Sequence, residues 1–207
     1  MKILGITGSS GAGKSTFSKF LSEKQEFRVI DADKVSKELA VPGNEYLDSI
    51  KNTFGEDILL DDGNLNRKLL ASKIYNNEEE REKLNSLTVK YILKEIYNRM
   101  KKIVDPKVKY IAVDAPLLFE TGFDKVCDYV VSLIADKDLQ IERICQRDNI
   151  DYETAVSRLN SQKSASFYTE NADFVIMSGK NCNLKEEADK LLFKLEQKEK
   201  KPNDEVR

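Results

Sequence analysis

Residues 8–15 read Gly-Ser-Ser-Gly-Ala-Gly-Lys-Ser, a glycine-rich stretch that ends in adjacent lysine and serine residues. Residues 2–7 before it are mostly apolar, which predicts a short buried β-strand. After it, apolar residues at Phe17, Phe20 and Leu21 follow helical spacing, which predicts a helix with one buried face. A G-x-x-x-x-G-K-S pattern between a strand and a helix is a P-loop.

A P-loop binds the phosphates of a nucleoside triphosphate. Glycines let the chain turn so that backbone N–H groups, together with the positive end of the following helix, meet phosphate oxygens. Lys14 adds a mobile positive charge that can reach the β- and γ-phosphates, and the Ser15 hydroxyl can ligate Mg²⁺. The residues that we expect at the nucleotide are Gly8, Gly11, Ala12, Gly13, Lys14, Ser15 and Thr16. The motif alone does not specify how the triphosphate is used.

The net charge, the apolar runs and the cysteines of the chain exclude several classes of protein. The 207-residue chain has a formal net charge of -2, so no basic excess indicates nucleic-acid binding. We find no apolar run of membrane-spanning length and no secretory leader before the first predicted strand, which favours a cytoplasmic protein. Cys127, Cys145 and Cys182 fit neither a zinc site nor a disulfide framework and are expected to be reduced thiols.

The chain contains no histidine. This excludes catalysis by a serine–histidine or cysteine–histidine pair, and it excludes a metal site built on histidine. A general base must then be a carboxylate or, less favourably, a lysine. The metal that we expect is Mg²⁺, because it prefers oxygen ligands.

Two further predicted strands lead into acidic residues. Residues 27–30 precede Asp31 and Asp33, and residues 108–113 end on Asp114. Ligands of an open α/β sheet collect at the carboxyl ends of its strands, so these carboxylates are expected on the same rim as the P-loop. Asp31 could equally cap the next helix, whereas Asp114 matches the second P-loop element, which orients Mg²⁺ or its water.

A long helical segment is predicted between the strands. Apolar residues repeat at helical spacing from Leu65 to Ile96, over a length greater than a crossover needs. We interpret about residues 61–104 as a helical insertion that covers the substrate, within a single domain whose core is residues 1–60 and 105–200. The alternative is a helical pair that only packs on the sheet.

Three arginines lie between the predicted strands at residues 128–134 and 174–177, namely Arg143, Arg147 and Arg158. The highly charged transition state of phosphoryl transfer requires positive charge and the exclusion of water. We therefore interpret about residues 143–170 as a lid that brings these arginines to the phosphates. For each arginine alone, the alternative is a surface ion pair with a nearby acid.

Together these motifs resemble the dephospho-coenzyme A kinase family, from Met1 to the closing helix. The segments that carry the resemblance beyond the P-loop are Asp31-Ala32-Asp33, Pro42-Gly43, Phe54-Gly55, Asp62 to Arg67, Asp114-Ala115-Pro116-Leu117-Leu118-Phe119-Glu120, Gln140 to Arg143, Arg147-Asp148, Arg158, Gln162 and Ala172-Asp173. The resemblance implies transfer of the ATP γ-phosphoryl group to the ribose 3′-hydroxyl of dephospho-coenzyme A, the last step of coenzyme A synthesis. It also implies an α/β fold of three layers, in which helices flank a parallel five-stranded sheet, with a helical acceptor-binding insertion and a lid.

The resemblance also implies residue roles. Asp33 is the candidate base that accepts the hydroxyl proton, and this fits the absence of histidine. The other residues expected to act on the phosphoryl group are Lys14, Arg143 and Arg147. Arg158 is expected at the nucleotide, and the implied Mg²⁺ ligands are Ser15 and Asp114. ATP and dephospho-coenzyme A are the implied partners, without nucleic acid or membrane, and a monomer is the default.

Three positions depart from the pattern of the family. Val89-Lys90 replaces a common His-Pro pair, Tyr168-Thr169 stands where a basic residue is usual, and Met177-Ser178 lacks the usual asparagine. We expect the lid either to hold the phosphates more weakly or to have its phosphate contacts redistributed to Arg143, Arg147 and Arg158. The alternatives are another small-molecule P-loop kinase acting on a nucleoside or nucleotide, a nucleotide-binding switch without phosphotransfer, and an inactive relative.

Overall fold

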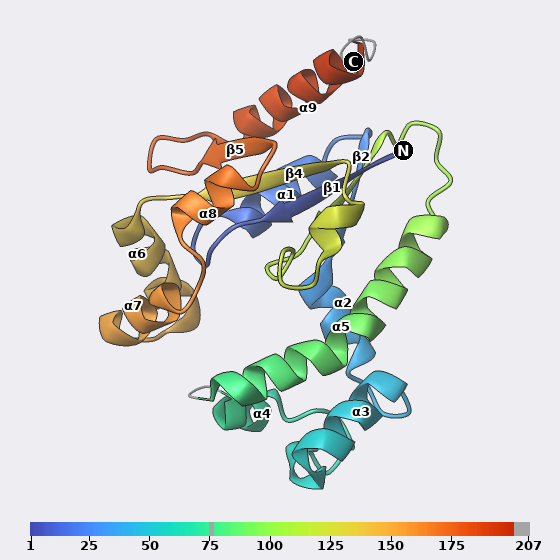
Figure 1. Cartoon of the computed structure of the whole chain (residues 1–207), viewed down its shortest axis with the longest axis vertical. Coiled ribbons are helices and arrows are strands. Elements are labelled where there is room, and N and C mark those ends of the chain that lie inside the picture. Colours follow the sequence, from blue (N-terminus) through green and yellow to red (C-terminus); the bar gives the residue numbers. More distant parts are fainter. Residues whose placement is uncertain (75–76, 201–207) are drawn as a thin grey trace. The chain divides into compact units, whose positions relative to one another are not determined.

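The computed structural model describes residues 1–74 and 77–200, which form two compact units (Figure 1). One unit contains Met1–Val29 and the described residues from Asp105 onward, and it carries the P-loop and the predicted lid. The other unit is Ile30–Val104 and is helical. Within the described residues, none of the helices combines the length and the apolar character that a membrane crossing requires.

The predicted parallel five-stranded sheet is confirmed. Its strands are arranged in the order β2-β3-β1-β4-β5, and β1 pairs in parallel with both β3 and β4. The register places Ile6 beside Asp114 and Thr7 beside Ser132, so the P-loop starts where β3 and β4 end. The strand bounds are β1 Lys2–Thr7, β2 Phe27–Asp31, β3 Tyr110–Asp114, β4 Tyr129–Ile134 and β5 Phe174–Met177.

Helices flank the sheet because their apolar stripes require cover. The helix after the P-loop, α1 (Lys14–Ser22), and the closing helix, α9 (Leu184–Lys200), pack together and bury Phe17, Leu21 and Leu191 against the strands. The short helix α8 (Ala165–Glu170) packs on β4, and Figure 1 shows it beside β4 and β5. Full burial of each large apolar side chain contributes about 1.5–3 kcal/mol.

The predicted lid region is helical. It contains the second half of α6 (Lys137–Asp148), all of α7 (Tyr152–Asn160) and α8. Ile141, Ile144 and Ala155 form a small apolar cluster that holds α6 against α7. Asn149 ends α6 in the left-handed conformation with φ 51°, and the Asp151 side chain caps α7 by accepting from the Thr154 N–H at 2.8 Å.

The helical unit begins at Ile30, earlier than the expected insertion at about residue 61. Its elements are α2 (Ala32–Leu39), α3 (Glu45–Phe54), the 3₁₀ turn η1 (Glu56–Ile58), α4 (Arg67–Ile74) and α5 (Glu78–Lys101). The earlier start has a packing reason, because Leu47 and Ile50 of α3 share one core with Leu70 of α4. Leu65, expected on a helix, instead forms an antiparallel bridge with Leu59.

Candidate active site

The P-loop takes its shape from three glycines in left-handed conformations. The φ angles are 138° at Gly8, 75° at Gly11 and 90° at Gly13. A Cβ atom at Gly8 would lie 2.1 Å from the backbone oxygen of Leu133, and one at Gly11 would lie 2.6 Å from that of Gln140. Side chains are therefore excluded at Gly8 and Gly11 both by backbone conformation and by close contact with β4 and α6.

Lys14 is the first residue of α1 and lies over the loop that precedes it. Its Nζ donates hydrogen bonds to the backbone oxygens of Gly8 at 2.5 Å and Ser9 at 3.0 Å. An ammonium group on a flexible stem can exchange such contacts for phosphate oxygens without movement of the backbone. The geometry therefore keeps the predicted phosphate-binding charge at the loop.

The predicted Mg²⁺ ligands come from the start of α1 and the end of β3. The buried carboxylate of Asp114 accepts a hydrogen bond at 2.7 Å from the hydroxyl of Ser18, which lies three residues after Ser15 on α1. No group of three or more histidine, cysteine, aspartate or glutamate side chains in residues 1–74 and 77–200 could hold a metal alone. A hydroxyl and one carboxylate nevertheless suit Mg²⁺, which retains waters and shares its sites with substrate phosphates.

Arg143 is held against the P-loop. From α6, its Nη1 donates to the backbone oxygen of Gly11 at 2.9 Å and to the Ser178 hydroxyl at 2.8 Å. Ser178 is almost completely buried and follows β5, so Arg143 joins the P-loop to the end of that strand. The structure thus brings the predicted residues Arg143 and Gly11 together.

Arg147 and Arg158 meet on Asp148. Arg147 donates to both carboxylate oxygens at 2.8 Å, and Arg158 donates to one of them. Hydrogen bonding and charge from Arg147, followed by the charge of Arg158, hold the pKa of Asp148 below its usual range. This is the ion-pair arrangement that the sequence left open for each arginine, and it gathers two lid arginines at one carboxylate.

Two glutamines hold the tip of the P-loop. The buried Gln140 donates through Nε2 to the Ser9 hydroxyl at 2.5 Å and to the Ser10 backbone oxygen at 3.0 Å. Gln162 accepts from the Ser10 N–H at 2.8 Å and donates to its hydroxyl at 3.0 Å. The predicted site omitted both glutamines, although both belong to segments that carry the family resemblance.

Asp33 lies in the first turn of α2 in the helical unit. The side chain of Asp31 caps that helix by accepting from the Lys34 N–H at 2.9 Å, which confirms the cap as one of its two predicted roles. In the same unit, burial raises the pKa of Tyr46, the Ser36 hydroxyl 2.6 Å away opposes that rise, and the charge of Asp33 adds to it. The charge of Asp33 therefore acts on the Tyr46 hydroxyl within the helical unit.

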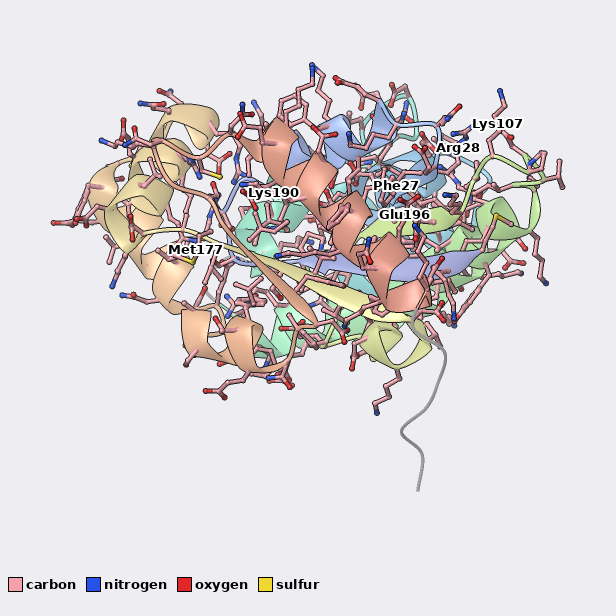
Figure 2. The ribbon with its side chains drawn as sticks, turned by 90° about the horizontal axis from the view of Figure 1, so that it is seen from above. Phe27, Arg28, Lys107, Met177, Lys190 and Glu196 are labelled. Atoms are coloured by element: carbon pink, nitrogen blue, oxygen red, sulfur yellow. The ribbon has the colours of Figure 1, made fainter. Side chains whose placement is uncertain are left out.

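A pocket of about 1120 Å³ lies beyond the carboxyl ends of β4 and β5. Its lining comes from α6, α9 and the loop after β5, and Figure 2 labels two of its residues, Met177 at the end of β5 and Lys190 on α9. Ser178 belongs to the lining and also receives the hydrogen bond from Arg143. The pocket is therefore linked to the P-loop, and its volume suits a small-molecule ligand.

Comparisons with known proteins support one family. The dephospho-CoA kinase family model matches residues 2–184 of the chain. A dephospho-CoA kinase of Fusobacterium nucleatum is 40% identical over 180 residues, which cover 86% of this chain and 90% of that protein. The solved dephospho-CoA kinase from Campylobacter jejuni has a TM-score of 0.66 and 26% identity, covering 95% of this chain and 98% of its own. A Thermus thermophilus protein of known structure, at a TM-score of 0.79 and 21% identity over 94% of this chain and 97% of its own, supports the fold alone.

Proposed function

The chain belongs to the dephospho-CoA kinase family, and from this premise we propose that it transfers the γ-phosphoryl group of ATP to the ribose 3′-hydroxyl of dephospho-CoA. The products are CoA and ADP. The observation that carries this proposal is the match of the dephospho-CoA kinase family model to residues 2–184. The P-loop, with Lys14 and the buried Asp114 at the same edge of the sheet, supplies the phosphate site that this reaction needs. The hydroxyl oxygen forms a bond to the γ-phosphorus, the bond to the β–γ bridging oxygen breaks, and the hydroxyl proton leaves to a base.

We assign most of the positioning to the P-loop. The backbone N–H groups of this loop and the start of α1 bind the phosphates, and Lys14 neutralises charge on the β- and γ-oxygens. Ser15 and Asp114 would hold Mg²⁺, which supplies a further positive charge on the phosphate oxygens. Arg143 contributes from its place against Gly11, and we propose that Arg147 and Arg158 complete the cationic surroundings of the phosphates.

We propose Asp33 as the base. The chain has no histidine, so a carboxylate is the natural acceptor of the hydroxyl proton. Asp33 stands two positions after β2, and the family pattern places the catalytic carboxylate at this position. A carboxylate within hydrogen-bond reach of the hydroxyl also holds it for in-line attack.

The remaining assignments follow from the same proposal. The helical unit Ile30–Val104 binds dephospho-CoA, and the segment of about residues 143–170 acts as the lid. The pocket beyond β4 and β5 takes the nucleoside part of ATP. We further propose a cytoplasmic enzyme that works as a monomer.

The test is a comparison of Asp33→Asn with Asp31→Asn. Loss of a general base lowers kcat about 10²- to 10⁴-fold, so we expect a fall of this size for Asp33→Asn with unchanged ATP binding. Asp31→Asn is the matched control, because asparagine caps a helix about as well as aspartate. CoA formation is followed by mass spectrometry and ATP binding by calorimetry. Full activity of Asp33→Asn would remove this residue from the mechanism.

A further inference from the structure

Lys163 lies immediately after a residue that is fixed to the P-loop. The side chain of Gln162 both accepts from and donates to Ser10, at 2.8 and 3.0 Å. These two bonds fix the chain next to Lys163 at the loop that binds the phosphates. The position of Lys163 therefore depends on the P-loop itself and not only on the packing of α8.

The Lys163 ammonium rests on an aromatic surface. Its Nζ lies 4.5 Å from the centroid of the Phe167 ring, and that ring packs edge-on against Phe119 with a centroid distance of 5.1 Å. Phe119 belongs to the turn that follows Asp114. A cation–π contact at an exposed site is worth about 0.5–1 kcal/mol, which is little enough for a phosphate to replace it.

The other cations of the lid are already engaged. Arg143 donates to Gly11 and Ser178, whereas Arg147 and Arg158 share Asp148. Across residues 143–170, all of which the structure describes, Lys163 is the cation with neither a carboxylate nor a backbone oxygen as its partner. An exposed lysine has three donors on a flexible stem, so Lys163 can reach an anion with the smallest loss of existing contacts.

We propose that Lys163 is a further catalytic residue, whose ammonium contacts the γ-phosphoryl group of ATP during transfer. This inference rests on the proposed phosphotransferase activity. Gln162 supplies the fixed point, and Phe167 holds the lysine when no phosphate is bound. Lys163 forms no covalent bond and only offsets the charge on the oxygens of the phosphoryl group.

The experiment compares Lys163→Met, Lys163→Arg and the control Lys107→Met. Lys107 is exposed on the loop before β3, as Figure 2 shows, and its replacement removes the same charge. We expect Lys163→Met to lower kcat about 10- to 100-fold and to weaken ATP binding more than ADP binding, because the contact is to the γ-phosphoryl group. Lys163→Arg should retain most of the activity, and Lys107→Met should behave as wild type.

Two outcomes would overturn the role of Lys163. One is a kcat for Lys163→Met within twofold of wild type. The other is equal loss in Lys163→Met and Lys163→Arg with equal weakening of ATP and ADP binding, because that result assigns the residue to packing on Phe167. Failure of the wild-type protein to phosphorylate dephospho-CoA would instead refute the proposed function, and the ATP-against-ADP binding comparison would still test the γ-phosphoryl contact.

Discussion

Replacing Gln140 by leucine should loosen the P-loop without changing the shape of α6. Leucine nearly preserves the buried volume but removes the two hydrogen bonds that Nε2 donates, to the Ser9 hydroxyl at 2.5 Å and to the Ser10 backbone oxygen at 3.0 Å. Each neutral hydrogen bond contributes about 0.5–1.5 kcal/mol, so the two together contribute about 1–3 kcal/mol. We expect the free energy of unfolding of Gln140→Leu to fall by that amount and the affinity for ATP to fall with it.

The assay is urea denaturation followed by circular dichroism, together with calorimetric titration of ATP. Gln146→Leu is the matched control, because Gln146 is on the same helix but exposed, and its side chain donates only a long hydrogen bond of 3.4 Å to Glu142 among the contacts of the described residues. A surface change of this kind alters stability by less than about 0.5 kcal/mol. Equal stability and equal ATP affinity of the two variants would refute the claim that Gln140 supports the P-loop.

Three further predictions concern the same unit. Gly8→Ala should lower stability by about 1–3 kcal/mol in urea denaturation, since its Cβ would meet the Leu133 oxygen at 2.1 Å, and unchanged stability would contradict the close contact. Burial raises the pKa of Cys127 from 9.0 to about 12, so its thiol ionises at lower pH in the unfolded state than in the folded state. The wild-type protein should therefore lose stability relative to Cys127→Ala as the pH rises through that interval. Parallel curves of stability against pH for the two proteins would argue against this burial. Hydrogen bonding from Arg147 and the charge of Arg158 lower the pKa of Asp148, so its carboxylate stays paired with both arginines as pH falls through the usual aspartate range and loses this pairing only in stronger acid. Asp148→Asn should lower kcat/KM about threefold to tenfold at neutral pH, and wild-type kinetics would show that the pairing is dispensable.

The sequence was sufficient to predict the sheet and the P-loop, because both depend on local patterns. Apolar runs marked the strands, and the glycine spacing before Lys14 marked the loop. The caps at Asp31 and Asp151 were also predictable, since a cap acts only a few residues along the chain. These features require no knowledge of which distant residues meet.

The start of the helical unit could not be predicted from periodicity. The stripe that contains Leu47 and Ile50 shows that α3 buries one face, but it does not show which partner covers that face. The partner proved to be the core that also contains Leu70, so the unit begins at Ile30. The boundary therefore depends on tertiary packing, which the spacing of apolar residues in one helix does not reveal.

The contacts of the predicted site residues were also beyond the sequence. The positions of Arg143, Arg147 and Arg158 predicted positive charge in the lid, but the partners depend on side-chain conformations. The pairing of Arg158 with Asp148 requires α7 to fold back on α6. Lys163 gave no sequence signal, because its interest comes from the anchored Gln162 and the ring of Phe167.

The most direct test of the central claim is an acceptor-dependent phosphotransfer assay on the wild-type protein. ATP and Mg²⁺ are supplied with dephospho-CoA, with a panel of nucleosides and nucleotides, or without an acceptor, and ADP and products are measured by coupled absorbance and ³¹P NMR. The account predicts ADP and CoA in equal amounts with dephospho-CoA, the new phosphate on the 3′-oxygen, and little ADP otherwise. ADP release that is indifferent to the acceptor, or transfer only to a nucleoside or nucleotide, would contradict it.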